Sequence, residues 1–297
     1  MKLSAIQHLI TIVERGSIRA AARQLDIAQP VLTRSIQELE RELKTVLLER
    51  GKKGVHLTSM GQVFLRRATV ATGELRRAQD ELAQLRGETQ GSLSLGMSMA
   101  SQITLLPGAL RQFRQRYPDV SLSIIDTLFP GIEGALKEGR VDMYVGPVLG
   151  DPPAGLAAEQ IFEIERVIFC RKDHPLAGSR SLRDLIDAEW MTTSIASKAE
   201  EEMGPIFAQH GLPAPRLVMH AHSGLTYMIG LANSDLLVLL PDSWMRLAQW
   251  KDMFHMIPIQ EALPKRPICI VQRHGLPLTP AAEYFCDMLR REATYLK

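Results

Sequence analysis

The stretch AARQLDIAQPVLTRSIQELE, residues 21–40, determines how the first part of the chain folds. It has helical character on both sides of Pro30. A proline inside a helix removes a hydrogen bond and clashes with the preceding turn, but in the first turn its missing amide hydrogen has no partner in any case. We therefore predict that one helix ends before Pro30 and that a new helix begins at about Ala28 or Gln29.

Two helices are expected before this break. Residues 3–13 place apolar side chains at helical spacing, and Gly16 stops that helix. Ser17 then fits the N-cap of a short second helix, whose small alanines allow a close approach to its neighbours. Three helices connected this tightly predict a helix-turn-helix.

The third helix carries two different faces. Its buried stripe consists of Leu32, Ile36, Leu39 and Leu43. The opposite face offers amide, hydroxyl and guanidinium groups and no carboxylate before Glu38, and its members are Gln29, Pro30, Thr33, Arg34, Gln37 and Arg41. The alternative, a solvated face, is usually rich in Glu and Lys with opposite charges four residues apart. Because Gln, Thr and Arg can donate to phosphates and contact base edges, we interpret this face as one that reads DNA.

A basic hairpin is expected directly after the third helix. In VLLERGKKGVHLTSMGQ, residues 46–62, two apolar stretches flank a glycine-bounded tip with Arg50, Lys52 and Lys53. These cations suit a wing along the sugar-phosphate backbone, whereas the glycine spacing does not fit a P-loop. The charge distribution agrees, because residues 1–60 hold ten Lys or Arg against six Asp or Glu, and the rest of the chain holds 25 against 27.

These elements carry a family resemblance. The segment GSIRAAARQLDIAQPVLTRSIQELERELKTVLLERGKKGVHLTSMG, residues 16–61, resembles the winged helix-turn-helix of LysR-type transcriptional regulators, and the layout of the whole chain is similar to that family. The resemblance implies a regulator of transcription that binds double-stranded DNA, with residues 1–58 as its DNA-binding domain. Ala28 departs from the family, which usually has a capping Ser or Thr there, and the missing cap costs about 1 kcal/mol of helix stability.

Residues 59–88 are predicted to form one long linker helix. Spacings of three and four residues alternate along a narrow apolar seam made of Ala68, Ala71, Leu75, Ala78, Leu82 and Leu85. A partner helix is the natural cover for so thin a stripe, and in the family this helix pairs two subunits. We therefore expect a dimer or tetramer of this chain, the alternative being a helix that lies on its own body.

The remainder, residues 89–297, is predicted to be an α/β effector domain that follows a polar hinge at residues 87–92. Apolar strands alternate with helices, including one at 103–117 and one at 130–139, which favours mainly parallel sheets. Further strands are expected near residues 166–170, 190–193, 217–220, 236–240 and 264–274, with a closing helix from about Pro280. Two lobes result, at about 91–162 with 268–297 and at 163–267. This resembles the family's effector domain, which is similar to periplasmic binding proteins.

Ligands of open α/β sheets lie beyond the carboxyl ends of the strands. By that rule the candidates for ligand binding are Ser98, Ser101, Gln102, Thr127, Ser194 and Ser223, although hydroxyls at these places can equally cap their helices. The resemblance places Ser98, Thr127 and Ser194 where the family lines its effector cleft. His220 and His222 lie near the same edge and are read as structural. The family's glycines before one strand are replaced by Asn233, Ser234 and Asp235, which bears on the shape of the cleft there.

The expected effector is a small anion, an organic carboxylate or sulfonate, because free helix amides stabilise negative charge without a buried lysine. Neither a cofactor nor a metal is expected, since Cys170, Cys269 and Cys286 lie far apart and have no ligand-like spacing. No run of 18 apolar residues is present, so the expected location is the cytoplasm. Two alternatives stay open: an enzyme with dispersed catalytic residues, although none of the common catalytic motifs is found, and a DNA-bridging oligomer without a ligand.

Overall fold

The computed structural model of the protein describes residues 1–51, 54–129, 131–192, 199–221 and 223–296. The chain divides into two units. One consists of Met1–Arg86 with Lys137–Arg140, and the other of Gly87–Leu136 with Val141–Lys297.

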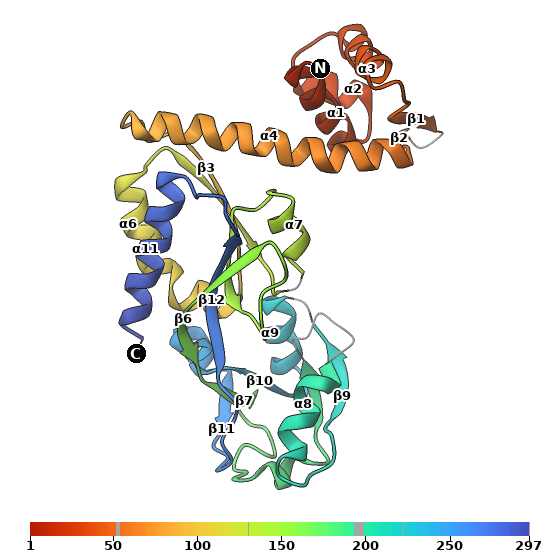
Figure 1. The fold of residues 1–297 in the computed structure, drawn as a ribbon. Coiled ribbons are helices and arrows are strands. Elements are labelled where there is room, and N and C mark those ends of the chain that lie inside the picture. The colour runs from red at the N-terminus through yellow and green to blue at the C-terminus, as the bar shows by residue number, and fades with distance from the viewer. Residues whose placement is uncertain (52–53, 130, 193–198, 222, 297) are drawn as a thin grey trace. The chain divides into compact units, whose positions relative to one another are not determined.

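The first unit begins with three helices and a hairpin, drawn in red in Figure 1. Their bounds are α1 (Leu3–Arg15), α2 (Ile18–Gln24), α3 (Gln29–Leu43), β1 (Leu48–Gly51) and β2 (Gly54–Leu57). Gly16 ends α1 in the left-handed conformation, and the Ser17 hydroxyl accepts from the Ala20 amide at 3.1 Å. Pro30 lies in the first turn of α3, and the Ala28 side chain makes no capping bond. The predicted break at Pro30 is thereby confirmed.

The core of these elements is built from the apolar stripes of the helices. Leu9, Ile12, Leu32 and Leu47 are completely buried, whereas Leu43 of the predicted stripe is only half-buried. The hairpin is held against the end of α1, since the Val55 amide donates to the Gly16 carbonyl at 3.2 Å. A Cβ atom at Gly54 would come within 2.6 Å of that carbonyl, so only glycine allows the approach.

A single long helix, α4 (Ser59–Leu85), follows the hairpin. Thr58 caps it by accepting from the Gly61 amide at 2.9 Å, and its hydroxyl donates to the Val46 carbonyl at 2.7 Å. The first turns of α4 contribute Phe64 and Leu65 to the core of the three helices. This helix is therefore attached to the winged region by side-chain packing as well as by its cap.

The second unit contains two five-stranded sheets. The first lobe has the strand order β4-β3-β5-β12-β6. Its elements are β3 (Gly91–Met97), α5 (Met99–Thr104), α6 (Leu106–Arg116), β4 (Val120–Asp126), α7 (Glu133–Lys137), β5 (Met143–Pro147), β6 (Leu156–Ile164), β12 (Arg266–Arg273) and α11 (Pro280–Thr294). Helices α6 and α11 pack side by side through Phe113 and Phe285 (Figure 1).

The second lobe has the strand order β11-β7-β10-β8-β9. Its elements are β7 (Arg166–Arg171), η1 (Leu182–Leu185), β8 (Glu189–Thr192), α8 (Ala199–Ala208), β9 (Arg216–His220), α9 (Gly224–Ala232), β10 (Leu237–Pro241), η2 (Asp242–Arg246), α10 (Ala248–Lys251) and β11 (Phe254–Ile257). The chain enters this lobe from β6 and leaves it into β12, so these two neighbouring strands carry the crossings between the lobes.

Three expectations for the second unit are corrected. Strands β6 and β11 were not predicted, because the exposed residues Glu159 and Gln160 interrupt the apolar residues of β6 and β11 has only four residues. The sheets are mixed, since β12 pairs antiparallel with β5 and β6, and β7 pairs antiparallel with β10 and β11. The helix expected at 103–117 is split at Leu105, because Pro107 requires a new first turn.

Candidate functional site

The outer face of α3 presents the side chains expected to read DNA. Gln29, Pro30, Arg34 and Gln37 are exposed, and Thr33 is half-buried. Arg34 is paired with a carboxylate of its own helix, because its Nε donates to Glu38 Oε1 at 3.0 Å. An exposed pair four residues apart contributes only a few tenths of a kcal/mol, so about 0.5 kcal/mol is enough to release the guanidinium to another acceptor.

The hairpin is fixed to α3 by a carboxylate. Glu40 Oε1 accepts from the backbone amides of Leu47 and Leu48 at 2.7 and 3.1 Å. These bonds set the point at which the hairpin leaves the helix. Arg50 lies in β1, its side chain is outside the described part of the structure, and Lys52 and Lys53 lie outside the described residues. The roles expected for these three cations therefore stay predictions.

Two arginines of α2 belong to the same surface and were missed in the sequence. Arg19 and Arg23 are exposed and line a shallow hollow together with Asp26 and Gln29. In a helix-turn-helix the helix before the reading helix crosses the sugar-phosphate backbone. The signal was present, since two arginines four residues apart lie on one face of a helix.

The seam expected on α4 is only partly open. Ala71 and Ala78 are exposed, and Leu75, Leu82 and Leu85 expose 51%, 58% and 70% of their surface. Ala68, the first predicted member, is buried and is removed from the seam. Five of the six residues thus leave apolar surface uncovered within this chain.

A cavity of about 720 Å³ lies between the lobes of the second unit. The carboxyl ends of β3, β4, β5 and β10 all reach it, as the topology of an α/β sheet leads one to expect. The structure brings three of the predicted ligand residues together here: Ser98 after β3, Thr127 after β4, and Ser223 at the start of α9. Ser194 lies outside the described residues.

Two predicted ligand residues do not line the cavity. Ser98 is the N-cap of α5, and its hydroxyl lies 2.8 Å from that of Ser101, which is completely buried one turn later. Gln102 is also engaged, because its Nε2 donates to the Met97 carbonyl at 3.1 Å and to Asp126 Oδ1 at 3.2 Å. Ser101 and Gln102 therefore bond to Ser98 and Asp126, which line the cavity, but do not line it themselves. His220 is exposed on β9 and does not line it.

The cavity carries charges that the sequence analysis did not assign to it. Asp126, Glu133 and Asp151 come from the first lobe, and Arg166 and Arg266 are the first residues of the strands that follow the two crossings. Arg166 is buried, and its Nε donates to the Pro264 carbonyl at 3.0 Å. The overlooked signal is a basic residue at the start of each apolar strand that follows a crossing. The cavity therefore offers guanidinium groups to an anion in addition to helix amides.

The wall contributed by the second lobe is aromatic. The Tyr227 hydroxyl lies 2.9 and 2.6 Å from the carbonyl oxygens of Thr192 and Ala221. Trp244 packs against Trp250 with ring centroids 4.6 Å apart and ring planes tilted by 52°, and its buried indole N–H has no hydrogen-bond partner among the described residues. A ligand in this cavity therefore meets flat apolar surface together with a few polar groups.

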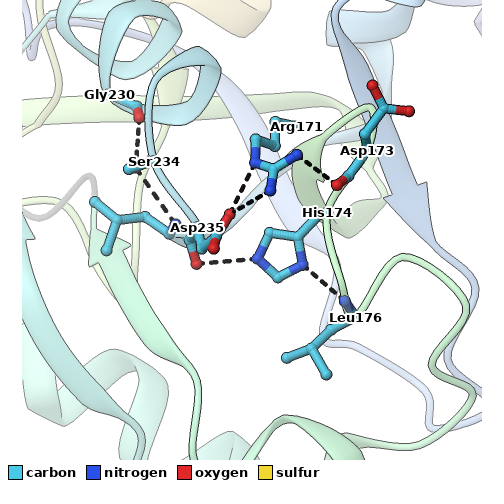
Figure 2. A network of polar contacts seen from close by, with 8 residues as sticks. Arg171, Asp173, His174, Leu176, Gly230, Ser234 and Asp235 are labelled. Atoms are coloured by element: carbon cyan, nitrogen blue, oxygen red, sulfur yellow. Dashed lines mark hydrogen bonds and ion pairs between the residues drawn. The ribbon is translucent and has the colours of Figure 1, made fainter.

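Figure 2 shows the turn in which this chain departs from the family's glycines. Arg171 Nε and Nη2 donate to Asp235 Oδ1 at 2.8 and 2.7 Å. His174 Nδ1 accepts from the Leu176 amide at 3.0 Å, and its Nε2 faces the Asp235 carbonyl at 3.0 Å. The tautomer that satisfies both contacts carries its proton on Nε2.

This turn does not shape the cavity, a point that the sequence analysis left open. Ser234 and Asp235 directly precede β10, whereas the cavity is lined by Leu239, Leu240 and Pro241 at the other end of that strand. The Ser234 hydroxyl donates to the Gly230 carbonyl at 2.6 Å (Figure 2). Hydrogen bonds of side chains thus hold this turn, which glycines form in the family. The turn lies at a distance from the candidate ligand site.

Other kinds of site find no support in the described part of the chain. Among those residues, no three His, Cys, Asp or Glu side chains gather as metal ligands would. All three cysteines are buried, and burial raises the pKa of the Cys170 thiol to about 11. None of the described helices combines the length and apolar character that a membrane span requires.

Two family models match the chain. The model of bacterial regulatory helix-turn-helix proteins of the lysR family matches residues 3–62, which include α1, α2, α3 and the hairpin. The model of the LysR substrate binding domain matches residues 86–294, which include both lobes and the cavity. Together they span the DNA-reading face and the candidate ligand site.

The chain is also similar in sequence to known transcriptional regulators. The chain is 24% identical to the HTH-type transcriptional regulator TdcA of Escherichia coli K12 over 297 residues, covering 99% of this chain and 95% of that protein. It is 30% identical to a probable RuBisCO transcriptional regulator of Porphyra purpurea over 221 residues, or 72% of this chain and 69% of that protein. These relatives are transcriptional regulators rather than enzymes.

Solved structures show the same fold. CbnR, a LysR family transcriptional regulator, has a TM-score of 0.74 at 24% identity with 99% of each chain covered. CbnR complexed with its target DNA has a TM-score of 0.73 at 24% identity, covering 98% of this chain and 100% of that one. Full-length BenM has a TM-score of 0.57 at 25% identity, covering 100% of this chain and 98% of that one.

Proposed function

Because the chain belongs to the LysR family of transcriptional regulators, we propose that a small organic anion in the cavity between its lobes switches its action on DNA. The family makes it a DNA-binding regulator with a substrate-binding domain. The proposal adds the chemical class of the effector and the residues that bind it. It also assigns residues 1–58 to DNA binding, 59–88 to dimerisation and 89–297 to effector binding, in a protein that acts in the cytoplasm.

The DNA contacts are assigned to α3 and its neighbours. Gln29, Arg34 and Gln37 are exposed donors on one face and are proposed to read bases, whereas Pro30 and Thr33 add apolar contact. The cations of the hairpin and of α2 are proposed to contact phosphates, namely Arg50, Lys52, Lys53, Arg19 and Arg23. This division gives the affinity for DNA two contributions. Base contacts make one that depends on the DNA sequence, and phosphate contacts make one that does not.

Pairing of two chains is assigned to the exposed seam on α4. Its leucines have no cover within the described chain, and their spacing suits a second helix of the same kind. A dimer then presents two reading helices to two half-sites. This makes a reading helix without a side-chain cap sufficient, because the second half-site adds to the binding energy.

The single observation that carries the effector assignment is the cavity itself. About 720 Å³ is a suitable size for a small metabolite, and the walls combine hydroxyls, aromatic rings and the guanidinium groups of Arg166 and Arg266. Arginine binds carboxylates and sulfonates through paired donors, which favours an organic carboxylate or sulfonate with an apolar body. A ligand that prefers one arrangement of the lobes shifts the population toward it by its differential affinity.

A thermal-melting screen against a broad library of organic acids tests this proposal. A saturable rise in melting temperature with a carboxylate or sulfonate is expected, and it should be smaller with the uncharged amide or ester of the same compound. Turnover of a compound would favour an enzyme, and silence across the library would favour a DNA-bridging protein. Mapping the DNA sites bound by the chain supplies candidate effectors from the neighbouring genes.

A further inference from the structure

The cavity between the lobes contains charges of both signs. Three carboxylates, those of Asp126, Glu133 and Asp151, come from the first lobe. Two guanidinium groups, those of Arg166 and Arg266, come from the strands that follow the crossings. Among the described residues of the lining, carboxylates thus outnumber cations by three to two. A ligand whose only charge is negative would increase this excess of negative charge.

Asp126 lies where a ligand of this sheet is expected. It is the last residue of β4, and the next residue, Thr127, also lines the cavity. Its Oδ1 accepts from Gln102 Nε2 at 3.2 Å, and the same Nε2 donates to the carbonyl of Met97, the last residue of β3, at 3.1 Å. A neutral amide therefore holds the Asp126 carboxylate in place without supplying a positive charge.

Two carboxylates of the cavity lack the ion pairs that other carboxylates of this unit make. Asp235 and Asp287 pair with arginines at 2.7 Å. In the part of the chain that the structure describes, neither Asp126 nor Asp151 forms such a pair. Partial burial raises the pKa of Asp126, and the hydrogen bond from Gln102 offsets only part of this effect. A cation beside Asp126 would compensate for the hydration that its carboxylate has lost.

The other walls suit the rest of a ligand. Arg166 is buried, and the bond from its Nε to the Pro264 carbonyl fixes the guanidinium group where it can meet a carboxylate. Leu240, Tyr227 and Trp244 add apolar and aromatic surface. Trp244 is 5% exposed, and no described residue accepts from its indole N–H. The cavity thus offers an anion site, an apolar wall and carboxylates without a cation.

We propose that the effector is an amino acid in the broad sense, a carboxylate that also carries a protonated amine, and that Asp126 is the specificity-determining residue that receives the ammonium group. This inference rests on the proposed function of the cavity and deepens it. Arg166 and Arg266 bind the ligand's carboxylate, as proposed above, and the carboxylates of the first lobe face its cation. Such a ligand adds no net charge to the cavity, whereas a simple organic acid adds one negative charge.

Pairs of ligands that differ only in the amine test this proposal on the full chain without DNA. The panel contains the α-amino acids with apolar side chains together with β-alanine, γ-aminobutyrate and ε-aminocaproate, so that the separation of the two charged groups varies. Each is compared with its hydroxy analogue, which keeps the carboxylate and the size of the ligand and loses the positive charge. Melting temperature identifies the compounds that bind, and calorimetry gives their Kd.

The same pairs are measured on Asp126→Asn, which keeps the shape of the side chain and removes its charge. Asp252→Asn is the matched control, because Asp252 is exposed and does not line the cavity. Comparing each ligand with its analogue on one variant cancels any general loss of stability, so the ratio of the two Kd values reports the ammonium group alone.

At least one amino acid should stabilise the wild type saturably and bind about tenfold more tightly than its hydroxy analogue. This ratio should fall toward one in Asp126→Asn and stay at the wild-type value in Asp252→Asn. Equal binding of every amino acid and its analogue would overturn the ammonium site, and an unchanged ratio in Asp126→Asn would overturn the role of Asp126. Binding of simple organic acids alone would overturn this inference and leave the proposed function standing, whereas silence toward every acid would overturn both.

Discussion

At the scale of single residues, Arg34 and Gln37 are expected to contribute to specific rather than to general DNA binding. Both side chains are exposed on α3, and Arg34 gives up only a surface pair with Glu38 to reach a base. Replacing either with Ala should weaken binding to the mapped site by about 1–3 kcal/mol and leave binding to unrelated DNA nearly unchanged. Gel-shift titrations at fixed salt measure both quantities, with Arg183→Ala in the second lobe as the control for lost charge.

The cations of the hairpin should affect binding to all DNA sequences rather than binding to one site. Replacing Lys52 and Lys53 together with Ala should weaken binding to every DNA sequence and lower the salt slope by about 0.9 for each lost phosphate contact. Affinity measured at several salt concentrations gives the slope. An unaltered slope together with unaltered specific binding in the α3 variants would contradict the assignment of this whole surface.

Single residues also show where the sequence analysis stops. The caps at Ser17 and Ser223 follow from local pattern, because an N-cap interacts within three residues of itself. The hydrogen bond from Arg166 to the Pro264 carbonyl joins residues far apart in the sequence, so no spacing rule points to it. For the same reason, the arginines at the starts of β7 and β12 could not be placed in the cavity beforehand.

At the scale of elements, helices and hairpins were predictable wherever the pattern was strong. The break before α3 follows from Pro30, and the hairpin from two glycines that bound a charged tip. Strand β6 was missed because the exposed residues Glu159 and Gln160 interrupt its apolar residues, so that no continuous apolar run marks it. Mixed pairing in the sheets depends on the path of the crossing strands, which local patterns do not determine.

Helix α4 gives the prediction for this scale. Leu82→Asp should dissociate dimers, since a carboxylate without a partner would enter the apolar seam, at a cost of about 2 kcal/mol or more. Gln79→Asp adds the same charge at an exposed position off the seam and should leave the dimer intact. Sedimentation at micromolar concentration measures the difference. A monomeric wild type would refute the pairing.

At the scale of the whole molecule, the sequence pattern and the resemblance together predicted a reading head, a long helix and a two-lobed α/β body. What they missed lies in the cavity, where Ser98, Thr127 and Ser223 were expected but the charged and aromatic walls were not. A cavity forms from residues of several elements, and its composition appears only when the sheets are assembled. In the proposed function, the ligand selects one arrangement of the lobes.

The most direct measurement of this account is a DNase footprint on a mapped DNA site, with and without the effector found by melting, for the wild type and Thr127→Val. Thr127 lines the cavity and its hydroxyl makes only a long 3.4 Å contact with the Leu128 carbonyl, so valine preserves the fold. The effector should change the wild-type footprint, and Thr127→Val should bind the same DNA without that change. A ligand-dependent change of equal size in Thr127→Val, with full-strength effector binding by calorimetry, would place the effector outside this cavity and contradict the account.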